Sequence, residues 1–286
     1  MTAAPRRWTS MVPVRIRQLP RFLSQTAARL AIGRRTLPDS ATIHLCYFTC
    51  KSYYPYHLCS LDSLRRLGYD SAIKVHVFCD EQEMFSPAQI ECMKEILPNL
   101  DIISWPKSQG WGSNEIRNIW LAYEHVCRSA GERDYVARVD SDVFFLADWL
   151  FRLVLKSGAD LFGDGHYVNF SYIQGGCYFL SVPAIRTLCA EFHSGEALRR
   201  LSPTDVLVED VALFRAAEAQ RLEIRMMWFM MFPDEYRNAG SIGPYERWKF
   251  ACLHYAIRDK RGMLAAYESL LSVEERLQLR QRLTCA

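Results

Sequence analysis

Hydrophobic and polar residues after residue 40 follow patterns that predict strands alternating with helices. An apolar run at 42–48 predicts a buried strand, and an apolar-periodic segment at 56–67 predicts a helix that ends at Gly68. Residues 72–78 alternate between apolar and polar, which predicts a second strand. Residues 86–89, with the sequence SPAQ, place a serine at the N-cap, a proline in the first turn and a glutamine at the third position, which predicts a helix start.

The alternation continues through the middle of the chain and ends in helices. It predicts an α/β fold, a single domain with a Rossmann-like, mostly parallel central sheet flanked by helices. Ligands of such sheets bind at the carboxyl ends of the strands. We expect further strands at 100–105, 134–139, 160–162 and 177–181. Five further helices are expected: one after the N-cap Ser113, one over 148–156 before Gly158, one that starts near Pro183, one after Glu209-Asp210 and one over 263–282.

Composition and charge exclude several classes of protein. The chain has 286 residues, of which 50% are hydrophobic and 23% charged, as in a soluble globular protein with a sizeable core. The net charge of +3 is uneven, because residues 1–40 hold eight arginines against Asp39, a balance of 8 − 1 = +7, which leaves 3 − 7 = −4 for the rest. A nucleic-acid-binding domain would carry its basic residues in the folded part, so no nucleic-acid partner is expected.

We therefore divide the chain into a basic N-terminal leader at 1–40, the predicted α/β domain at 41–258 and a C-terminal helical extension at 259–286 that packs on the outside. Arginines and apolar residues of the leader fall on opposite faces of a short amphipathic helix, which would give peripheral membrane contact. Its two prolines, Pro13 and Pro20, equally suit a poorly ordered leader. With no apolar span, no secretory signal and scattered cysteines, the expected location is cytoplasmic, at the inner face of a membrane.

The chemistry begins at Asp140-Ser141-Asp142, where the predicted strand at 134–139 ends. Two carboxylates one residue apart are hard oxygen ligands that suit Mg²⁺ or Mn²⁺. A DxD triplet alone is weak, since an acid in a loop is commonly just solvated. Here apolar runs lie on both sides of the triplet, where burying a charge without a partner would cost several kcal/mol.

Residues 135–145 resemble the DxD region of GT-A glycosyltransferases, and three downstream segments support this in the order those enzymes show. Residues 174–181 are similar to the strand beneath the donor sugar and acceptor, residues 208–213 to the acidic pair of inverting Fringe and β-1,3-galactosyltransferase families, and His254 to the C-terminal metal ligand. The resemblance covers about 42–258. Those families carry a longer acidic run and a membrane anchor with a stem, which this sequence does not show, so the resemblance is to the superfamily.

The resemblance implies a metal-dependent GT-A glycosyltransferase. It would move a sugar from a nucleotide-diphosphate sugar, expected to be a UDP-sugar, to a hydroxyl of a glycan, lipid-linked or protein acceptor. Asp142 would be the first ligand of Mn²⁺ or Mg²⁺, Asp140 would bind it through water or hold the ribose, and His254 would be the third ligand. Asp210 would be the base of an inverting reaction and Glu209 would orient the acceptor.

Other residues are expected to contact the substrates. Three residues before the strand at 177–181 would line the donor sugar and acceptor: Gln174, Gly175 and Gly176. Donor contacts are expected from Thr49, Lys51, Asp80, Asn114, Arg117 and Ser141, and Trp111, Tyr172 and Trp228 are candidate sugar platforms.

Simpler interpretations of these residues stay open. His254 could be a core histidine, the acids at 209–210 could complement a helix dipole, Arg117 could be a surface residue and the aromatic residues could be core. Three other functions are also open: a retaining GT-A glycosyltransferase, a metal-dependent phosphohydrolase and a non-catalytic sugar-binding module. A phosphohydrolase of the haloacid-dehalogenase type has its DxD after the first strand, whereas here it follows about the fourth.

Overall fold

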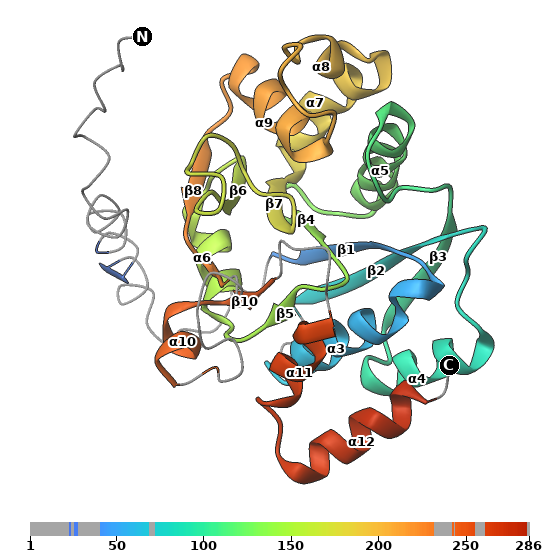
Figure 1. Cartoon of the computed structure of the whole chain (residues 1–286). Coiled ribbons are helices and arrows are strands. Elements are labelled where there is room, and N and C mark those ends of the chain that lie inside the picture. Colours follow the sequence, from blue (N-terminus) through green and yellow to red (C-terminus); the bar gives the residue numbers. More distant parts are fainter. Residues whose placement is uncertain are drawn as a thin grey trace, which may run out of the picture.

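The computed structural model describes residues 41–68, 72–231, 242, 244–254 and 261–284, together with residues 23, 26 and 27 (Figure 1). The prediction of an amphipathic leader rests on residues 1–40, which otherwise lie outside the described residues. No helix in the described ranges is long and apolar enough to cross a membrane. The nine cysteines in these ranges are free thiols, and all but Cys189 are buried.

A seven-stranded sheet forms the centre of the molecule, in the order β3-β2-β1-β4-β7-β6-β8. Strand β7 runs antiparallel to its two neighbours, and the other pairs are parallel. The predicted α/β fold with a mostly parallel sheet is confirmed. The strands are β1 (Ile43–Thr49), β2 (Ile73–Asp80), β3 (Leu100–Trp105), β4 (Tyr135–Val139), β6 (Leu161–Asp164), β7 (Cys177–Ser181) and β8 (Ile224–Met227).

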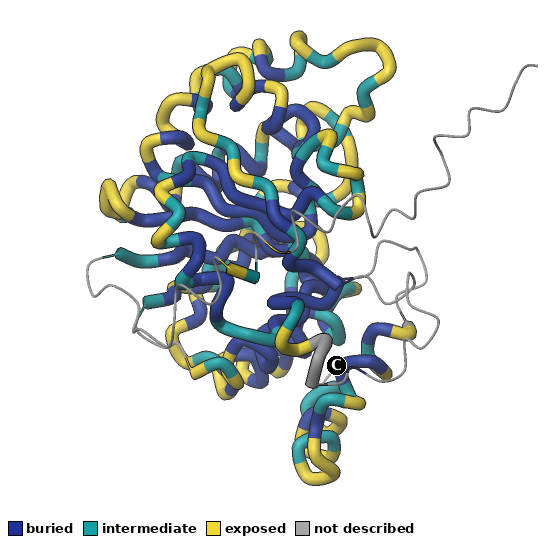
Figure 2. Tube along the Cα trace, turned by 90° about the vertical axis from the view of Figure 1, so that its left-hand side faces the viewer, coloured by how far each residue is buried: buried dark blue, intermediate teal, exposed yellow. Residues whose placement is uncertain are grey.

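Helices cover both faces of this sheet, with α5, α7 and α9 on one side and α3, α4, α11 and α12 on the other (Figure 1). All seven residues of β1 are buried, as expected for a central strand of a covered parallel sheet. Figure 2 shows the strands as a buried band within the molecule. The helices are α3 (Tyr54–Arg65), α4 (Pro87–Ile96), α5 (Ser113–Cys127), α6 (Trp149–Ser157), α7 (Val182–Ser194), α8 (Glu196–Arg199), α9 (Glu209–Ala219), α10 (Pro244–Lys249), α11 (Arg261–Glu268) and α12 (Val273–Leu283), with the 3-10 turn η2 at Lys51–Tyr53.

Local sequence signals set several of the helix ends. Ser86 and Gln89 form both hydrogen bonds of the predicted capping box at the start of α4. Gly158 ends α6 in the left-handed conformation, with φ of 65°. The prediction of Ser113 as an N-cap is wrong: Ser113 is the first helical residue of α5 and Gly112 is the cap. Gly112 has a φ of 142°, which glycine adopts without strain.

A second, three-stranded sheet brings the C-terminal part of the domain to the end of β4. It consists of β5 (Phe144–Phe145), β10 (Cys252–Leu253) and β9 (Met230–Met231), with β10 in the middle. Strand β5 begins two residues after Asp142, and β10 ends one residue before His254. Pairing of β5 with β10 therefore carries His254 to the DxD motif.

The C-terminal residues form two helices, so the single helix predicted at 263–282 is wrong. Ser272 and Glu275 form a capping box that starts α12 after the end of α11. The Tyr267 hydroxyl on α11 donates to Asp62 Oδ2 on α3 at 2.6 Å. Both helices contribute residues to the core cluster on that face of the sheet.

Candidate active site

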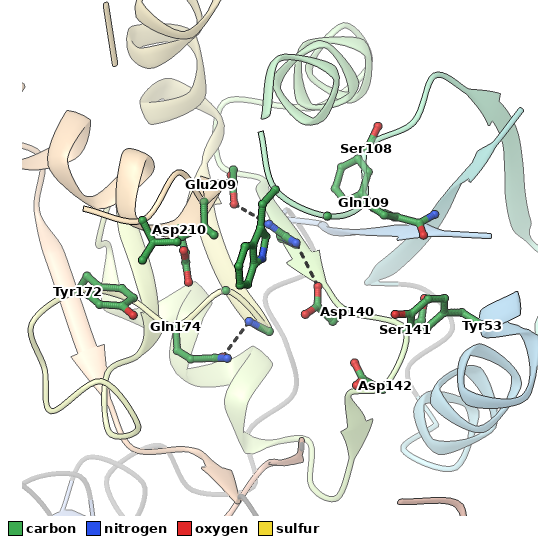
Figure 3. A pocket seen from close by; sticks show the side chains of 18 residues that line it. Tyr53, Ser108, Gln109, Asp140, Ser141, Asp142, Tyr172, Gln174, Glu209 and Asp210 are labelled. Atoms are coloured by element: carbon green, nitrogen blue, oxygen red, sulfur yellow. Dashed lines mark hydrogen bonds and ion pairs between the residues drawn. The ribbon is translucent and has the colours of Figure 1, made fainter. Parts of the chain in front are cut away.

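A cavity of about 490 Å³ opens at the carboxyl end of the central strands (Figure 3). Its walls come from the ends of β1 and β4, the loop after β3, the loop before β7 and the start of α9. It therefore lies where a parallel α/β sheet is expected to bind its ligand. It is lined by Phe48 and Tyr53, by residues 108–111, by Arg138 and residues 140–142, by Tyr172 and residues 174–176, and by Val206 and residues 208–210.

Asp140, Asp142 and His254 form a cluster beside this cavity. One ligand atom of each residue lies within 4.8 Å of the other two. His254 Nε2 is 3.4 Å from Asp142 Oδ1 and 3.8 Å from Asp140 Oδ2. The side chains of Asp142 and His254 are only 1% and 6% exposed. Two carboxylates and an imidazole, two of them buried, make a donor set that fits a divalent metal ion.

Two glycines before β7 let the backbone approach the acidic groups and the histidine. A Cβ atom at Gly176 would lie 2.7 Å from the His254 ring. A Cβ atom at Gly175 would lie 3.0 Å from Asp210 Oδ2. The Gly176 carbonyl also accepts a hydrogen bond from the Asp140 N–H at 2.8 Å, and Gln174 Oε1 accepts one from the Gly176 N–H at 2.8 Å. The segment thus contacts the DxD motif, His254 and the acidic pair.

Glu209 and Asp210 have different environments. Glu209 is 4% exposed, and its carboxylate accepts hydrogen bonds from Arg138 Nη1 at 2.9 Å and from the Tyr178 hydroxyl. Asp210 is partly exposed to the cavity, and its Oδ1 accepts a hydrogen bond from the Val211 N–H at 2.8 Å. Burial raises the pKa of Asp210 to about 6, with Arg138 opposing the rise and Glu209 adding to it. Asp210 is the more accessible carboxylate of the pair, and its raised pKa makes it a stronger base than an ordinary aspartate.

The predicted donor-binding residues are not all brought together. Ser141 lines the cavity, and its buried hydroxyl has no hydrogen-bond partner among the described residues. Thr49 is buried at the end of β1 but is not part of the lining. Lys51 lines a separate depression beside residues 82–84. Asp80, Asn114 and Arg117 lie outside the lining, and donor contact by these residues stays a prediction.

Several lining residues were not predicted from the sequence. Arg138 is one of them, although an arginine inside the apolar strand before the DxD motif is a usable signal. Tyr53 is another; the predicted donor contact was Lys51, two residues earlier. Of the candidate sugar platforms, Trp111 and Tyr172 line the cavity, whereas Trp228 stacks on His166 with ring centroids 3.8 Å apart.

Comparison with solved structures identifies the architecture. The bifunctional glycosyltransferase WbbM superposes with a TM-score of 0.56 at 12% identity, over 87% of this chain and 52% of WbbM. An active-site mutant of the galactosyltransferase LgtC gives 0.51 at 15% identity, over 82% of this chain and 99% of LgtC. GlyE of Streptococcus pneumoniae TIGR4 gives a TM-score of 0.50 at 15% identity, over 86% of this chain and 64% of GlyE. The fold is GT-A.

These identities show the fold alone. This chain spans about half the length of WbbM. No protein-family profile matches the sequence, and no curated protein matches it. The predicted GT-A resemblance is confirmed for the fold, and the nearer likeness to Fringe and β-1,3-galactosyltransferases is not confirmed.

Proposed function

We propose that this protein is a metal-dependent glycosyltransferase that moves a sugar from a UDP-sugar to an acceptor hydroxyl. The observation that carries the proposal is the cluster of Asp140, Asp142 and His254, whose two aspartates line the same cavity as Asp210. The fold supports it, because WbbM, LgtC and GlyE are all glycosyltransferases. Fold alone does not fix function, so the argument rests on the site.

Asp140, Asp142 and His254 would hold Mn²⁺ or Mg²⁺. A divalent cation bound there supplies positive charge that stabilises the diphosphate leaving group. The chain positions these ligands from two elements, since the DxD motif follows β4 and His254 follows β10. Ser141 offers a buried hydroxyl to the donor in the same place.

Asp210 would act as the general base of an inverting displacement. Its carboxylate takes the proton of the acceptor hydroxyl, the acceptor oxygen forms a bond to the anomeric carbon, and the bond from that carbon to the diphosphate oxygen breaks. A pKa of about 6 keeps Asp210 ionised at neutral pH while making it a stronger base than an ordinary aspartate. Gly175 leaves space for the Asp210 carboxylate at the cavity wall.

The two substrates would occupy opposite ends of the cavity. In Figure 3, Tyr53 and Ser141 lie toward one end of the cavity, with Tyr172 and Asp210 toward the other. We assign the nucleotide to the end with Tyr53 and the acceptor to the end with Tyr172, because the base must contact the acceptor. Aromatic rings at both ends suit a uracil ring and a sugar face. The expected acceptor classes are glycans, lipid-linked sugars and proteins.

Calorimetry of UDP binding with and without Mn²⁺ tests the metal site. We expect UDP affinity to depend on Mn²⁺ and Asp142→Asn to reduce it by about tenfold or more, because one of few anionic ligands is lost. Asp101→Asn, at an exposed position on β3, is the matched control and should bind as the wild type does. Equal affinity of the wild type with Mn²⁺ and with EDTA would refute the metal site.

A further inference from the structure

Arg138 joins the two halves of the cavity. It is the one basic side chain among the described lining residues, and it is 16% exposed. Its Nη1 is 2.9 Å from Glu209 Oε2, and its Nη2 is 3.3 Å from Asp140 Oδ1 (Figure 3). One guanidinium thus contacts both the first acid of the DxD motif and the first acid of α9.

Glu209 is held from a second side. The Tyr178 hydroxyl on β7 donates to Glu209 Oε1, and the Tyr178 and Tyr123 hydroxyls are 2.6 Å apart. Glu209 is the first residue of α9, so these contacts fix the start of that helix. Asp210 is the next residue. The place of its carboxylate in the cavity therefore depends on how Glu209 is anchored.

We propose that Arg138 is a positioning residue that sets where the base lies relative to the DxD motif. The inference rests on the proposed function, since it assigns Asp210 as base and Asp140 as a metal ligand. A guanidinium is suited to this role because its planar fork presents several N–H donors in fixed directions. A lysine would bring the same charge but only a single flexible ammonium group. The role therefore requires the guanidinium of an arginine, and a positive charge alone is not enough.

Charge balance alone is a competing explanation, because Arg138 lies among four carboxylates that line the cavity. Removing one partner of a buried ion pair leaves the other charge uncompensated, whereas removing both is often tolerated. The double variant Arg138→Met/Glu209→Gln removes both charges and leaves an amide oxygen that can accept from Tyr178. It therefore separates the positioning role from charge compensation.

A matched control exists on α6. Arg152 is 14% exposed and pairs with Asp148 four residues earlier, outside the cavity lining. Arg152→Met/Asp148→Asn removes an ion pair whose arginine is about as buried as Arg138, while its carboxylate is 33% exposed against 2% for Glu209. We expect it to keep the wild-type kcat, so any loss in the cavity variant is not a general effect of deleting a buried pair.

The experiment measures three quantities on the full chain: the urea midpoint, Mn²⁺ affinity with the metal alone, and kcat and KM for Mn²⁺-dependent hydrolysis of UDP-galactose and UDP-glucose. For the double variant we expect a near wild-type midpoint, a kcat lowered at least about tenfold and a KM changed less than about threefold. Arg138→Lys should keep the charge and still lose kcat, which gives a second test should the double variant unfold. Arg138→Met alone should also move the acid limb of the kcat profile to higher pH, because Arg138 lowers the pKa of Asp210.

Wild-type kcat in the folded double variant or in Arg138→Lys would overturn the proposal. Titration with Mn²⁺ tests the contact with Asp140 without any turnover. In the double variant Asp140 is free of the guanidinium, so Mn²⁺ should bind at least about threefold more tightly. Unchanged Mn²⁺ affinity would show that the contact between Arg138 and Asp140 has no functional role. Failure of the wild type to bind UDP with Mn²⁺ or to hydrolyse either sugar would instead refute the proposed function. The two failures are therefore distinguishable.

Discussion

His57 is a fully buried histidine on α3 that the proposed reaction does not use. Neither of its ring nitrogens has a hydrogen-bond partner among the described residues. Its ring stacks on Phe85 and packs edge-on against Tyr47. Burial lowers the pKa of His57 to about 3. The folded state therefore excludes a proton that the unfolded chain binds below its ordinary pKa of about 6.5.

This difference predicts acid sensitivity with a definite sign. As pH falls from about 6.5 to about 3, His57 lowers the free energy of unfolding by about 1.4 kcal/mol per pH unit, because the unfolded chain gains a proton and the folded one does not. His57→Phe should remove this contribution to the pH dependence of the free energy of unfolding. It should also stabilise the protein by about 1 kcal/mol at pH 7, because phenylalanine replaces a buried polar ring without hydrogen-bond partners in the described part of the chain. Urea unfolding at a series of pH values measures both. An unchanged slope would show that His57 is not the proton acceptor.

A second prediction at the scale of a single residue concerns Asp210, the proposed base. Asp210→Asn should lower sugar transfer by at least about 10²-fold, because the amide keeps the size but cannot take the acceptor proton. UDP affinity with Mn²⁺ should hardly change, since Figure 3 shows Asp210 on the opposite side of the cavity from Tyr53, where we place the nucleotide. Wild-type turnover should fall below about pH 6 as Asp210 protonates. NMR showing a retained anomeric configuration in the product would refute Asp210 as base and favour the retaining alternative.

Elements with strong local signals were predictable from the sequence. The capping box at residues 86–89 and the left-handed glycine at 158 depend only on neighbouring residues, and both are confirmed. The single C-terminal helix was wrong because charged residues over 263–282 obscured the capping box at Ser272. Strands β5, β9 and β10 have two residues each, too few to show periodicity.

The candidate site divides in the same way. The DxD motif, the acidic pair and His254 could be selected because each stands out in its own segment. The DxD motif and the acidic pair line one cavity, and His254 lies beside the two aspartates of the motif. What brings His254 there is the pairing of β5 with β10, which is a long-range event with no local pattern. Arg138 was missed because its role depends on Glu209, 71 residues later in the chain.

The glycine segment before β7 gives a prediction about an element, because its two glycines face different groups. Gly176→Ala places a Cβ atom 2.7 Å from the His254 ring and should weaken Mn²⁺ binding by about tenfold or more. Gly175→Ala places a Cβ atom 3.0 Å from Asp210 and should lower kcat more than Mn²⁺ affinity. Each variant is the control for the other. The same change of Mn²⁺ affinity in both would show that the segment does not separate metal and base.

At the scale of the whole molecule, positive charge is concentrated in the leader. Residues 1–40 carry eight arginines and a single acid, while the rest of the chain is net negative. We propose that the leader contacts anionic membranes, where each basic residue near the surface contributes about 1 kcal/mol. Deletion of residues 1–38 should abolish co-sedimentation with phosphatidylserine vesicles and leave soluble turnover unchanged. Loss of folding on deletion would show instead that the leader belongs to the core.

The C-terminal helices α11 and α12 pack against α3. Tyr267 on α11 is 1% exposed and donates to Asp62 on α3, which is 5% exposed and also accepts from Arg65 Nη2 at 2.8 Å. Tyr267→Phe removes the donor and leaves a buried carboxylate with fewer partners, so the free energy of unfolding should fall by about 1–3 kcal/mol. Truncation after residue 258 should be worse, because it uncovers the α3 face that α11 and α12 pack on.

Urea unfolding of Tyr267→Phe beside Tyr267→Leu separates the hydrogen bond from packing, since the leucine variant loses both and should lie lower still. No described residue of α11 or α12 lines the cavity, so kcat of the folded Tyr267→Phe protein should equal that of the wild type. Cooperative unfolding of the protein truncated after residue 258, with a midpoint near that of the full chain, would contradict this account. It would make residues 259–286 a dispensable extension, whereas aggregation of that fragment would place them within the folding unit.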